Sequence, residues 1–221
     1  MNISPENRAQ ARDLLRFIDD SPSPWHAVHS IEQRLLAQGF TRLQEAERWK
    51  LAAGGRYYVV RDGSSVIAFK LGQNPLTETG FRMIGAHTDS PGLRLKTHAA
   101  HAGNGLVRLG VEIYGGPILA TFTDRDLSLA GRVNVRTANG FATRLIKFEQ
   151  PLLRLPNLAI HMNREVNEQG LKLNKQTELP LLFSLSNEKL GAREQFIGLL
   201  AEKLEVSAQD ILTYELNVFD T

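Results

Sequence analysis

The chain has 221 residues, which is enough for one large or two small domains. Hydrophobic residues make up 42% and charged residues 23%, a balance typical of a globular protein with a packed core. Lys and Arg number 26 against 24 Asp and Glu, and no basic run is present, so a nucleic-acid-binding surface is not expected.

Cysteine is absent, which excludes disulfides and thiolate metal ligands. A metal site in this chain would therefore use imidazole and carboxylate groups. Residues 1–8 lack the apolar core of a signal peptide, and no run approaches the ~20 apolar residues of a membrane span. We therefore expect a cytoplasmic protein that does not enter a membrane.

The amino-terminal region reads as two helices. Ser4-Pro5 is typical of a helix start, and an apolar stripe follows at the i, i+3, i+4, i+7 spacing of a helix, formed by Ala11, Leu14, Leu15 and Ile18. A second helix is expected to begin near Pro24 and to stop at Gly39. Its inward-facing residues would be Trp25, Val28, Ile31 and Leu35.

Strand patterns come next. Residues 56–61 and 66–71 are β-rich and are joined by Asp62-Gly-Ser-Ser65, which predicts a hairpin. The apolar run at residues 81–85 predicts a buried strand that leads into the turn containing His87.

From about residue 93 the pattern changes to short β runs with Gly-rich turns between them. The expected strands are 106–114, 118–123, 131–136, 141–148 and 214–219, and one helix is expected at 192–204. We therefore predict two domains, residues 1–92 and a mostly β domain at residues 93–221.

His87 and Asp89 form the strongest candidate site. They come directly after the predicted strand 81–85, and ligands of open α/β sheets bind outside the carboxyl ends of the strands. One ring nitrogen of His87 could bind a metal while the Asp89 carboxylate holds the other. The alternative is a polar turn capped by Asp89 and Ser90 before Pro91.

The remaining histidines do not complete a metal site. The chain has no His-Glu-x-x-His motif. His98 and His101 have ligand-like spacing for a helix, but glycines come at once after them and favour an exposed loop. His26 and His29 are expected to lie on the second helix, where they are expected to help fix its start.

Six segments together carry a family resemblance. They are SPSPWHA at 21–27, GGRYYV at 54–59, GAHTDSP at 85–91, GVEIYGG at 110–116, DRDLSLAGR at 124–132 and PNLAIHMNR at 156–164. The chain resembles the aspartyl aminopeptidase family, in which these segments occur in this order. The resemblance covers essentially the whole chain and corresponds to the amino-terminal half of that family.

The resemblance implies roles for three residues. His87 would be a zinc ligand, and Asp89 would act in catalysis by orienting it. His161 would reach into the active site of a neighbouring subunit and contact metal or substrate; without the resemblance, a core His in an apolar strand is the simpler interpretation. The remaining ligands and the general base lie beyond this half in the family.

Two further residues bear on the same comparison. Ala120 stands where many members of the family carry His, so any contact made by that His is lost. Arg125, between Asp124 and Asp126, is interpreted as part of an ion-paired structural corner.

The resemblance also implies the architecture and the activity. Residues 1–92 would begin an α/β zinc-peptidase domain, and residues 93–221 would form an inserted β-rich dimerisation domain. Complete members bind two Zn²⁺ per active site and release amino-terminal Asp or Glu from peptides by metal-activated water. Their dimers assemble into a large homo-oligomer. The alternative is a non-catalytic oligomerisation module, and in either case the 221-residue chain alone is predicted to be inactive.

Overall fold

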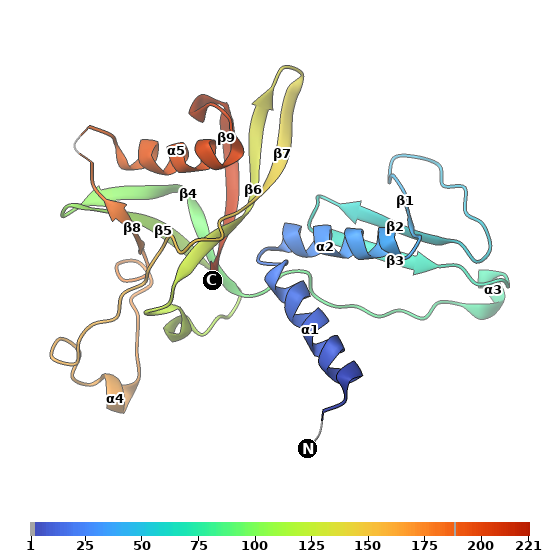
Figure 1. The fold of residues 1–221 in the computed structure, drawn as a ribbon, viewed down its shortest axis with the longest axis horizontal. Coiled ribbons are helices and arrows are strands. Elements are labelled where there is room, and N and C mark those ends of the chain that lie inside the picture. Colours follow the sequence, from blue (N-terminus) through green and yellow to red (C-terminus); the bar gives the residue numbers. More distant parts are fainter. Residues whose placement is uncertain (1–2, 188) are drawn as a thin grey trace. The chain divides into compact units, whose positions relative to one another are not determined.

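Residues 3–187 and 189–221 are described by a computed structural model, drawn as a ribbon in Figure 1. The chain divides into unit 1, Met1–Ser90, and unit 2, Pro91–Thr221. Unit 1 combines helices with a 3-stranded sheet, and unit 2 is built on a 6-stranded sheet. The mixed α/β class predicted from the sequence is therefore observed. None of the described helices is long and apolar enough to cross a membrane.

Both amino-terminal helices begin at a serine cap. In α1 (Pro5–Asp19), Oγ of Ser4 accepts a hydrogen bond from the backbone N–H of Asn7 at 3.2 Å. In α2 (Pro24–Ala37), Ser23 accepts one from the backbone N–H of His26 at 3.4 Å and lies 2.7 Å from Nδ1 of the same residue. His26 therefore helps to fix the helix start, as predicted.

The two helices differ in what they bury. Trp25 and Val28 of α2 are buried, whereas Ile31 and Leu35 are only partly covered. No residue of α1 is buried: its apolar stripe of Leu14, Leu15 and Ile18 is exposed by 58%, 58% and 56%. The stripe that the sequence shows is present, but it has no apolar cover among the described residues.

The sheet of unit 1 is short. Strands β2 (Arg56–Arg61) and β3 (Ser65–Lys70) form the predicted antiparallel hairpin, and β1 (Thr41–Arg42) pairs with β2 in parallel. The turn between β2 and β3 places Asp62 and Gly63 at positive φ. A short helix, α3 (Leu76–Thr79), comes after the hairpin.

The strand predicted at residues 81–85 is not formed. The segment lies outside both sheets, and its apolar side chains are exposed rather than buried. A strand needs a neighbour for its backbone groups and its side chains. The described residues offer none, and the predicted burial is therefore wrong for this structure.

Unit 2 is organised around a sheet with the strand order β7-β6-β9-β4-β5-β8. Its strands are β4 (Gly92–Gly103), β5 (Leu106–Tyr114), β6 (Leu127–Thr137), β7 (Gly140–Lys147), β8 (Leu181–Leu185) and β9 (Ile211–Asp220). The shorter helices are η1 (Leu119–Phe122), α4 (Val166–Gln169) and η2 (Ala208–Asp210).

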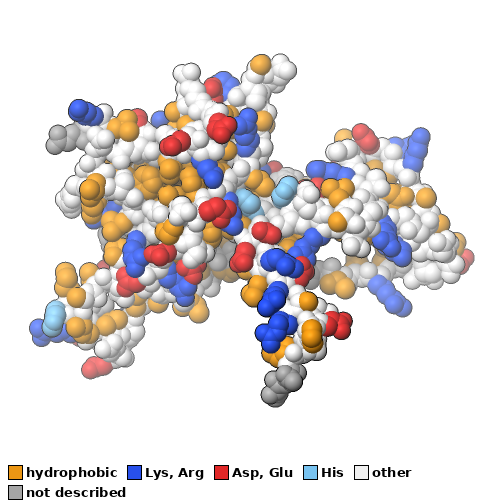
Figure 2. Space-filling model, in the orientation of Figure 1, with side chains coloured by type: hydrophobic (Ala, Val, Ile, Leu, Met, Phe, Trp, Pro, Cys, Tyr) orange, Lys and Arg blue, Asp and Glu red, His pale blue; other side chains and the backbone are white. Residues whose placement is uncertain are grey.

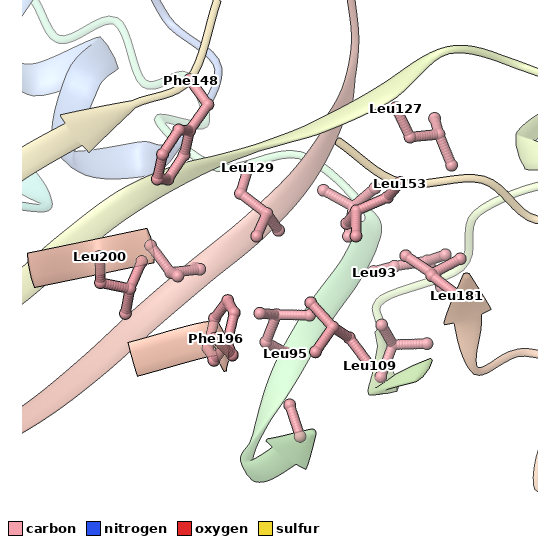
Figure 3. Close-up of a cluster of buried hydrophobic side chains, with 14 of the residues drawn as sticks. Leu93, Leu95, Leu109, Leu127, Leu129, Phe148, Leu153, Leu181, Phe196 and Leu200 are labelled. Atoms are coloured by element: carbon pink, nitrogen blue, oxygen red, sulfur yellow. The ribbon is translucent and has the colours of Figure 1, made fainter. Parts of the chain in front are cut away.

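The helix α5 (Ala192–Leu204) lies where the sequence predicts it and covers one face of this sheet. Figure 3 shows Phe196 and Leu200 of α5 in the same cluster as Leu95, Leu109 and Leu129 of the strands. The Phe196 ring packs edge-on against Tyr214, with 5.3 Å between centroids. These contacts give unit 2 a closed hydrophobic core.

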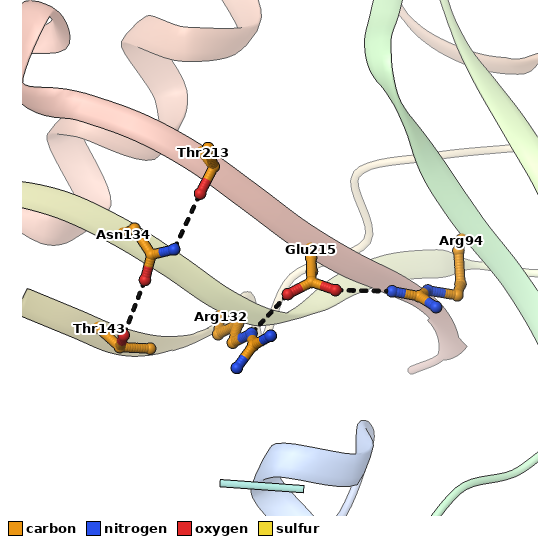
Figure 4. Close-up of polar contacts among 6 residues, drawn as sticks. All are labelled: Arg94, Arg132, Asn134, Thr143, Thr213 and Glu215. Carbon is orange, nitrogen blue, oxygen red and sulfur yellow. Dashed lines mark hydrogen bonds and ion pairs between the residues drawn. The ribbon is translucent and has the colours of Figure 1, made fainter. Parts of the chain in front are cut away.

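Polar side chains also connect the strands around β9. Glu215 contacts Nη2 of Arg94 at 3.0 Å and Nε of Arg132 at 2.5 Å. Asn134 donates to Oγ1 of Thr213 at 2.9 Å and accepts from Thr143 at 2.7 Å. Figure 4 shows that these bonds join β4, β9, β6 and β7.

The strand predicted at residues 118–123 is wrong, because the segment contains the 3₁₀ helix η1. Two hydroxyl groups explain the difference. Oγ1 of Thr121 donates to the Ile118 carbonyl and Oγ1 of Thr123 donates to the Ala120 carbonyl, each at 2.7 Å. Such local side-chain bonds stabilise a turn in competition with strand pairing.

We predict that Gly131→Ala destabilises unit 2. A Cβ at Gly131 in β6 would lie 2.0 Å from the carbonyl oxygen of Glu215 in β9, so the two strands would have to separate. The expected loss is about 2–4 kcal/mol in the free energy of unfolding. Denaturant unfolding monitored by circular dichroism would measure it.

The matched control is Gly110→Ala in β5, where a Cβ would meet nothing closer than 3.5 Å. Its effect should stay within about 1 kcal/mol. Equal stability of the two variants would contradict the assignment of close packing to Gly131.

Candidate metal-binding site

His87 and Asp89 are brought together as their spacing predicts. Nδ1 of His87 lies 2.9 Å from Oδ1 of Asp89, and the neighbouring Thr88 donates from Oγ1 to the Ser64 carbonyl at 2.8 Å. The second bond holds the turn against the β2–β3 loop. The His87 side chain is 88% exposed and that of Asp89 is 30% exposed.

This geometry suits an oriented metal ligand. A carboxylate beside Nδ1 favours the tautomer with the proton on Nδ1, which leaves Nε2 free to bind a metal ion. Because the ring is open to solvent, Nε2 is accessible. The pair can therefore supply one ligand with its direction already set.

The described residues do not complete a zinc site. Across residues 3–187 and 189–221, no group of three or more His, Asp and Glu side chains is placed to hold a metal ion. His26 contacts Ser23, and His29 is exposed on α2. Zinc usually takes three or four protein ligands, so a metal at His87 would need further ligands from outside this set.

His98 and His101 lie on strand β4, in neither a helix nor a loop. A register shift between Leu95 and Ala100 interrupts the pairing with β5. Both histidines are exposed, so the solvated interpretation of their side chains is correct although the predicted loop is wrong.

His161 lies on an exposed turn. The backbone N–H of Met162 donates to the Ala159 carbonyl at 2.8 Å and closes the turn. The alternative of a core histidine in an apolar strand is therefore wrong. An exposed imidazole on a loop is available to contact a second molecule.

A polar corner at residues 124–126 holds the start of this loop. Asp124 has a positive φ of 56°, and its carboxylate accepts from the backbone N–H of Asn157 at 3.1 Å. Arg154 contacts Asp126 at 2.6 Å and donates to the Asp124 carbonyl at 2.9 Å, and Arg125 pairs with Asp220. The ion-paired corner predicted from the sequence is present, but Arg154 was missed because its partners lie far away in the chain.

The chain was also compared with known proteins. A family model described as "Aminopeptidase I zinc metalloprotease (M18)" matches residues 17–221. The chain belongs to the M18 aminopeptidase family.

Two curated relatives show how much of an M18 protein this chain matches. A probable M18 family aminopeptidase 2 from Ectopseudomonas mendocina is 48% identical over 213 residues, which cover 94% of this chain and 49% of the relative. One from Azotobacter vinelandii is also 48% identical, with the same coverage. The chain therefore spans about half the length of the curated relatives it matches.

Solved M18 structures share the fold. A chain in the cryo-EM structure of an Ape4 and Nbr1 complex superimposes with a TM-score of 0.90 at 35% identity, covering 100% of this chain and 46% of that one. The protein mApe1 of Chaetomium thermophilum gives a TM-score of 0.81 at 31% identity, covering 95% of this chain and 50% of that one. Both units of the chain therefore correspond to parts of M18 proteins.

We predict that Arg154→Ala loosens the loop that carries His161. The variant loses the contacts to Asp126 and to the Asp124 carbonyl but keeps the backbone bonds between residue 154 and Leu182. Loss of these contacts should accelerate amide exchange at residues 157–163. The increase should be only about three- to tenfold, because contacts that are partly exposed to solvent contribute little stability. Hydrogen–deuterium exchange with mass spectrometry would measure the change.

Arg136→Ala is the control, since Arg136 is an exposed arginine of β6. Unchanged exchange at residues 157–163 in Arg154→Ala would show that the corner does not hold the loop.

Proposed function

We propose that this chain is the amino-terminal half of an M18 metalloaminopeptidase that releases acidic residues, Asp or Glu, from the amino termini of peptides. The observation that carries the proposal is the His87–Asp89 pair, with 2.9 Å between Nδ1 and Oδ1, in a chain that matches the M18 family from residue 17 to 221. The coverage of 49% of the relative's length supports the assignment to half of an enzyme. Specificity for acidic residues rests on the resemblance to aspartyl aminopeptidases.

In this proposal His87 is one metal ligand, and Asp89 orients its ring. Bound zinc would supply Lewis acidity and a water of lowered pKa, and the proposed complete site holds two ions. Asp89 would accept the hydrogen bond from Nδ1, fix the tautomer and hold the ring in one orientation. Hydrolysis would need further metal ligands and a general base, which the described residues do not place beside His87.

His161 is proposed to act in the active site of a neighbouring subunit, where it would contact metal or substrate. Its position on an exposed turn, held at its start by the corner at residues 124–126, supports such a contact. The imidazole can reach a partner because it is not packed in its own core.

Self-association through the β-rich domain predicted at residues 93–221, which lies within unit 2, is part of the same proposal. Strand β7 is at the edge of the sheet, and Phe141 at its start is 66% exposed. A free edge with exposed apolar residues favours pairing with another chain. The protein mApe1 of S. cerevisiae, which shares the fold at 24% identity and a TM-score of 0.76, is described as a dodecamer.

One observation favours a second candidate, a non-catalytic oligomerisation module. The core of unit 2 is closed, whereas the described residues provide a single oriented metal ligand. Joining the chain to the half of an M18 relative that it does not match distinguishes the two candidates. An enzyme would then hydrolyse peptide substrates, and an oligomerisation module would not. A cytoplasmic location is proposed for both, since a chain without Cys is compatible with a reducing compartment.

The proposal predicts activity for the chain joined to the unmatched half of the Ectopseudomonas mendocina relative. The joined protein should bind zinc and hydrolyse an α-aspartyl chromogenic substrate faster than a leucyl one. His87→Ala should lose one metal ion and nearly all kcat, and Asp89→Asn should lose about 10- to 100-fold in activity because the ligand is no longer oriented. Metal analysis and initial rates would measure both effects.

His98→Ala is the matched control, because this exposed histidine lies on β4 away from the proposed ligand set. The 221-residue chain alone should show no turnover that a chelator abolishes. Activity of the chain alone, or wild-type rates in both site variants, would refute the assignment of His87 and Asp89.

A second prediction concerns His161. Two inactive joined proteins, one with His87→Ala and one with His161→Ala, should regain part of the activity when their subunits exchange, because a mixed dimer contains one site with both residues intact. Activity measured before and after exchange tests this. No recovery despite exchange shown by native mass spectrometry would place His161 in the site of its own subunit.

A further inference from the structure

The turn at residues 86–90, which carries His87 and Asp89 and is called the site turn below, receives little support from the residues just before it. Phe81 is 75% exposed, Met83 is 89% exposed and Ile84 is 101% exposed, and these residues belong to neither described sheet. The His87 side chain is itself 88% exposed. Packing on this side of the turn therefore does not fix the direction in which the ring of His87 points.

Unit 1 also has a small core with which to hold a loop. The stripe of Leu14, Leu15 and Ile18 on α1 is exposed, and Figure 2 shows hydrophobic side chains on the surface of this helix beside basic ones. A loop that lies outside a packed core depends on a few specific contacts for its local stability. The contacts of the site turn with the rest of unit 1 are therefore important for its geometry.

Thr88 lies between the two residues of the candidate site and makes such a contact. Its Oγ1 donates to the carbonyl oxygen of Ser64, 24 positions earlier in the chain, at 2.8 Å. Both residues are partly buried. A hydrogen bond that is partly shielded from water is stronger than an exposed one. This bond connects the site turn to the β2–β3 loop through the residue next to His87.

The acceptor of this bond is presented by a hairpin loop of defined shape. Asp62 and Gly63 have positive φ values of 50° and 66°, and the backbone N–H of Ser64 donates to the Arg61 carbonyl at 3.2 Å. The pairing of β2 with β3 begins at once, with Arg61 opposite Ser65. The Ser64 carbonyl therefore has a fixed position relative to the two strands.

The same loop lies against the start of α2. A Cβ at Gly63 would lie 3.5 Å from Cδ1 of Trp25, a residue that is only 7% exposed. Trp25 belongs to the helix start that Ser23 caps through the backbone N–H of His26. The segment at residues 21–27 thus supports the loop that holds Thr88, and this connects it to the candidate site.

We propose that Thr88 is a positioning residue for the metal ligand His87, and that it acts through its hydrogen bond to the Ser64 carbonyl. Asp89 orients the ring within the site turn, whereas Thr88 holds the turn itself on the β2–β3 loop. With both contacts present, Nε2 of His87 is directed to one point in space. The inference rests on the proposed function, in which His87 binds zinc.

Thr88→Val tests the bond, because it removes the donor and keeps a side chain of nearly the same shape. In the 221-residue chain, amide exchange at residues 86–90 should accelerate by about three- to tenfold, since loss of one partly buried hydrogen bond favours opening of the turn by about that factor. Thr88→Ser keeps the hydroxyl group and should exchange as the wild type does. Hydrogen–deuterium exchange with mass spectrometry would measure both variants.

Thr79→Val is the matched control. Oγ1 of Thr79 also donates to a backbone carbonyl, that of Pro75 in the same unit, at 3.3 Å. The variant therefore loses the same kind of bond, but at α3 and not at the site turn. Exchange at residues 86–90 should remain at the wild-type rate.

Zinc binding is measured in the chain joined to the unmatched half of the Ectopseudomonas mendocina relative. Thr88→Val should weaken zinc binding by about 3- to 30-fold and lower kcat, because the ligand is no longer held in place. Thr88→Ser should restore both, and Thr79→Val should change neither. Thermal unfolding of the same samples checks for a general loss of stability, which would lower Tm without this pattern of rescue.

The acceptor side of the bond is tested at Gly63. Gly63→Ala strains a residue at a φ of 66°, which should displace the loop that presents the Ser64 carbonyl. Gly39→Ala introduces the same kind of strain at a φ of 74°, where a Cβ would meet no atom within 4 Å. Exchange at residues 86–90 should accelerate in Gly63→Ala and remain at the wild-type rate in Gly39→Ala.

Three results would overturn the inference. The first is wild-type zinc affinity or wild-type exchange at residues 86–90 in Thr88→Val. The second is an equal defect in Thr88→Val and Thr88→Ser, because the hydroxyl group would then not be the group that acts. The third is equal exchange at residues 86–90 in Gly63→Ala and Gly39→Ala, which would show that the β2–β3 loop does not hold the site turn.

His87→Ala in the joined protein separates this inference from the proposed function. If this variant keeps its zinc and its kcat, the proposed function is wrong and His87 is not a ligand. If it loses zinc while Thr88→Val binds zinc as the wild type does, the proposed function stands and the positioning role of Thr88 is refuted.

Discussion

The pairing of β9 with β6 is the interaction on which unit 2 depends. In the strand order β7-β6-β9-β4-β5-β8, β9 is the link between the β6–β7 hairpin and the β4–β5 hairpin. Its register runs from Leu127 opposite Asp220 to Val135 opposite Ile211. The side chains of Tyr214, Leu216 and Val218 then pack in the core with α5. The closed core is therefore a product of contacts between segments far apart in the chain.

Unit 1 lacks a comparable long-range pairing among its described residues. Its helices are capped locally, and its longest strands belong to one hairpin. Of its apolar residues, Trp25, Ala27, Val28, Tyr58 and Val59 are the described ones that are buried. Local signals are sufficient to form such elements, but burying their apolar faces needs additional layers of structure. This explains how a unit with well-formed helices leaves so many apolar side chains in water.

The candidate site shows the same division between local and long-range effects. The His87–Asp89 contact joins residues two apart, and its geometry depends on one turn. The loop carrying His161 is instead held by a corner in which Arg125 pairs with Asp220 and Arg154 pairs with Asp126. The partner of Arg125 is thus distant in the chain, although acidic residues flank it on both sides.

The sequence by itself determined the elements whose signals span a few residues. These are the helix starts at Ser4 and Ser23, the β2–β3 hairpin, helix α5, and the meeting of His87 with Asp89. The sequence also contains the six segments that resemble the aspartyl aminopeptidase family, and the match to the M18 family model supports that resemblance. The tertiary structure alone decided the strand order of unit 2, the exposure of His161 and the exposure of residues 81–84. Each of these depends on which distant segments are present to pair with a strand or to cover a side chain, and a local pattern of residues contains no information about that.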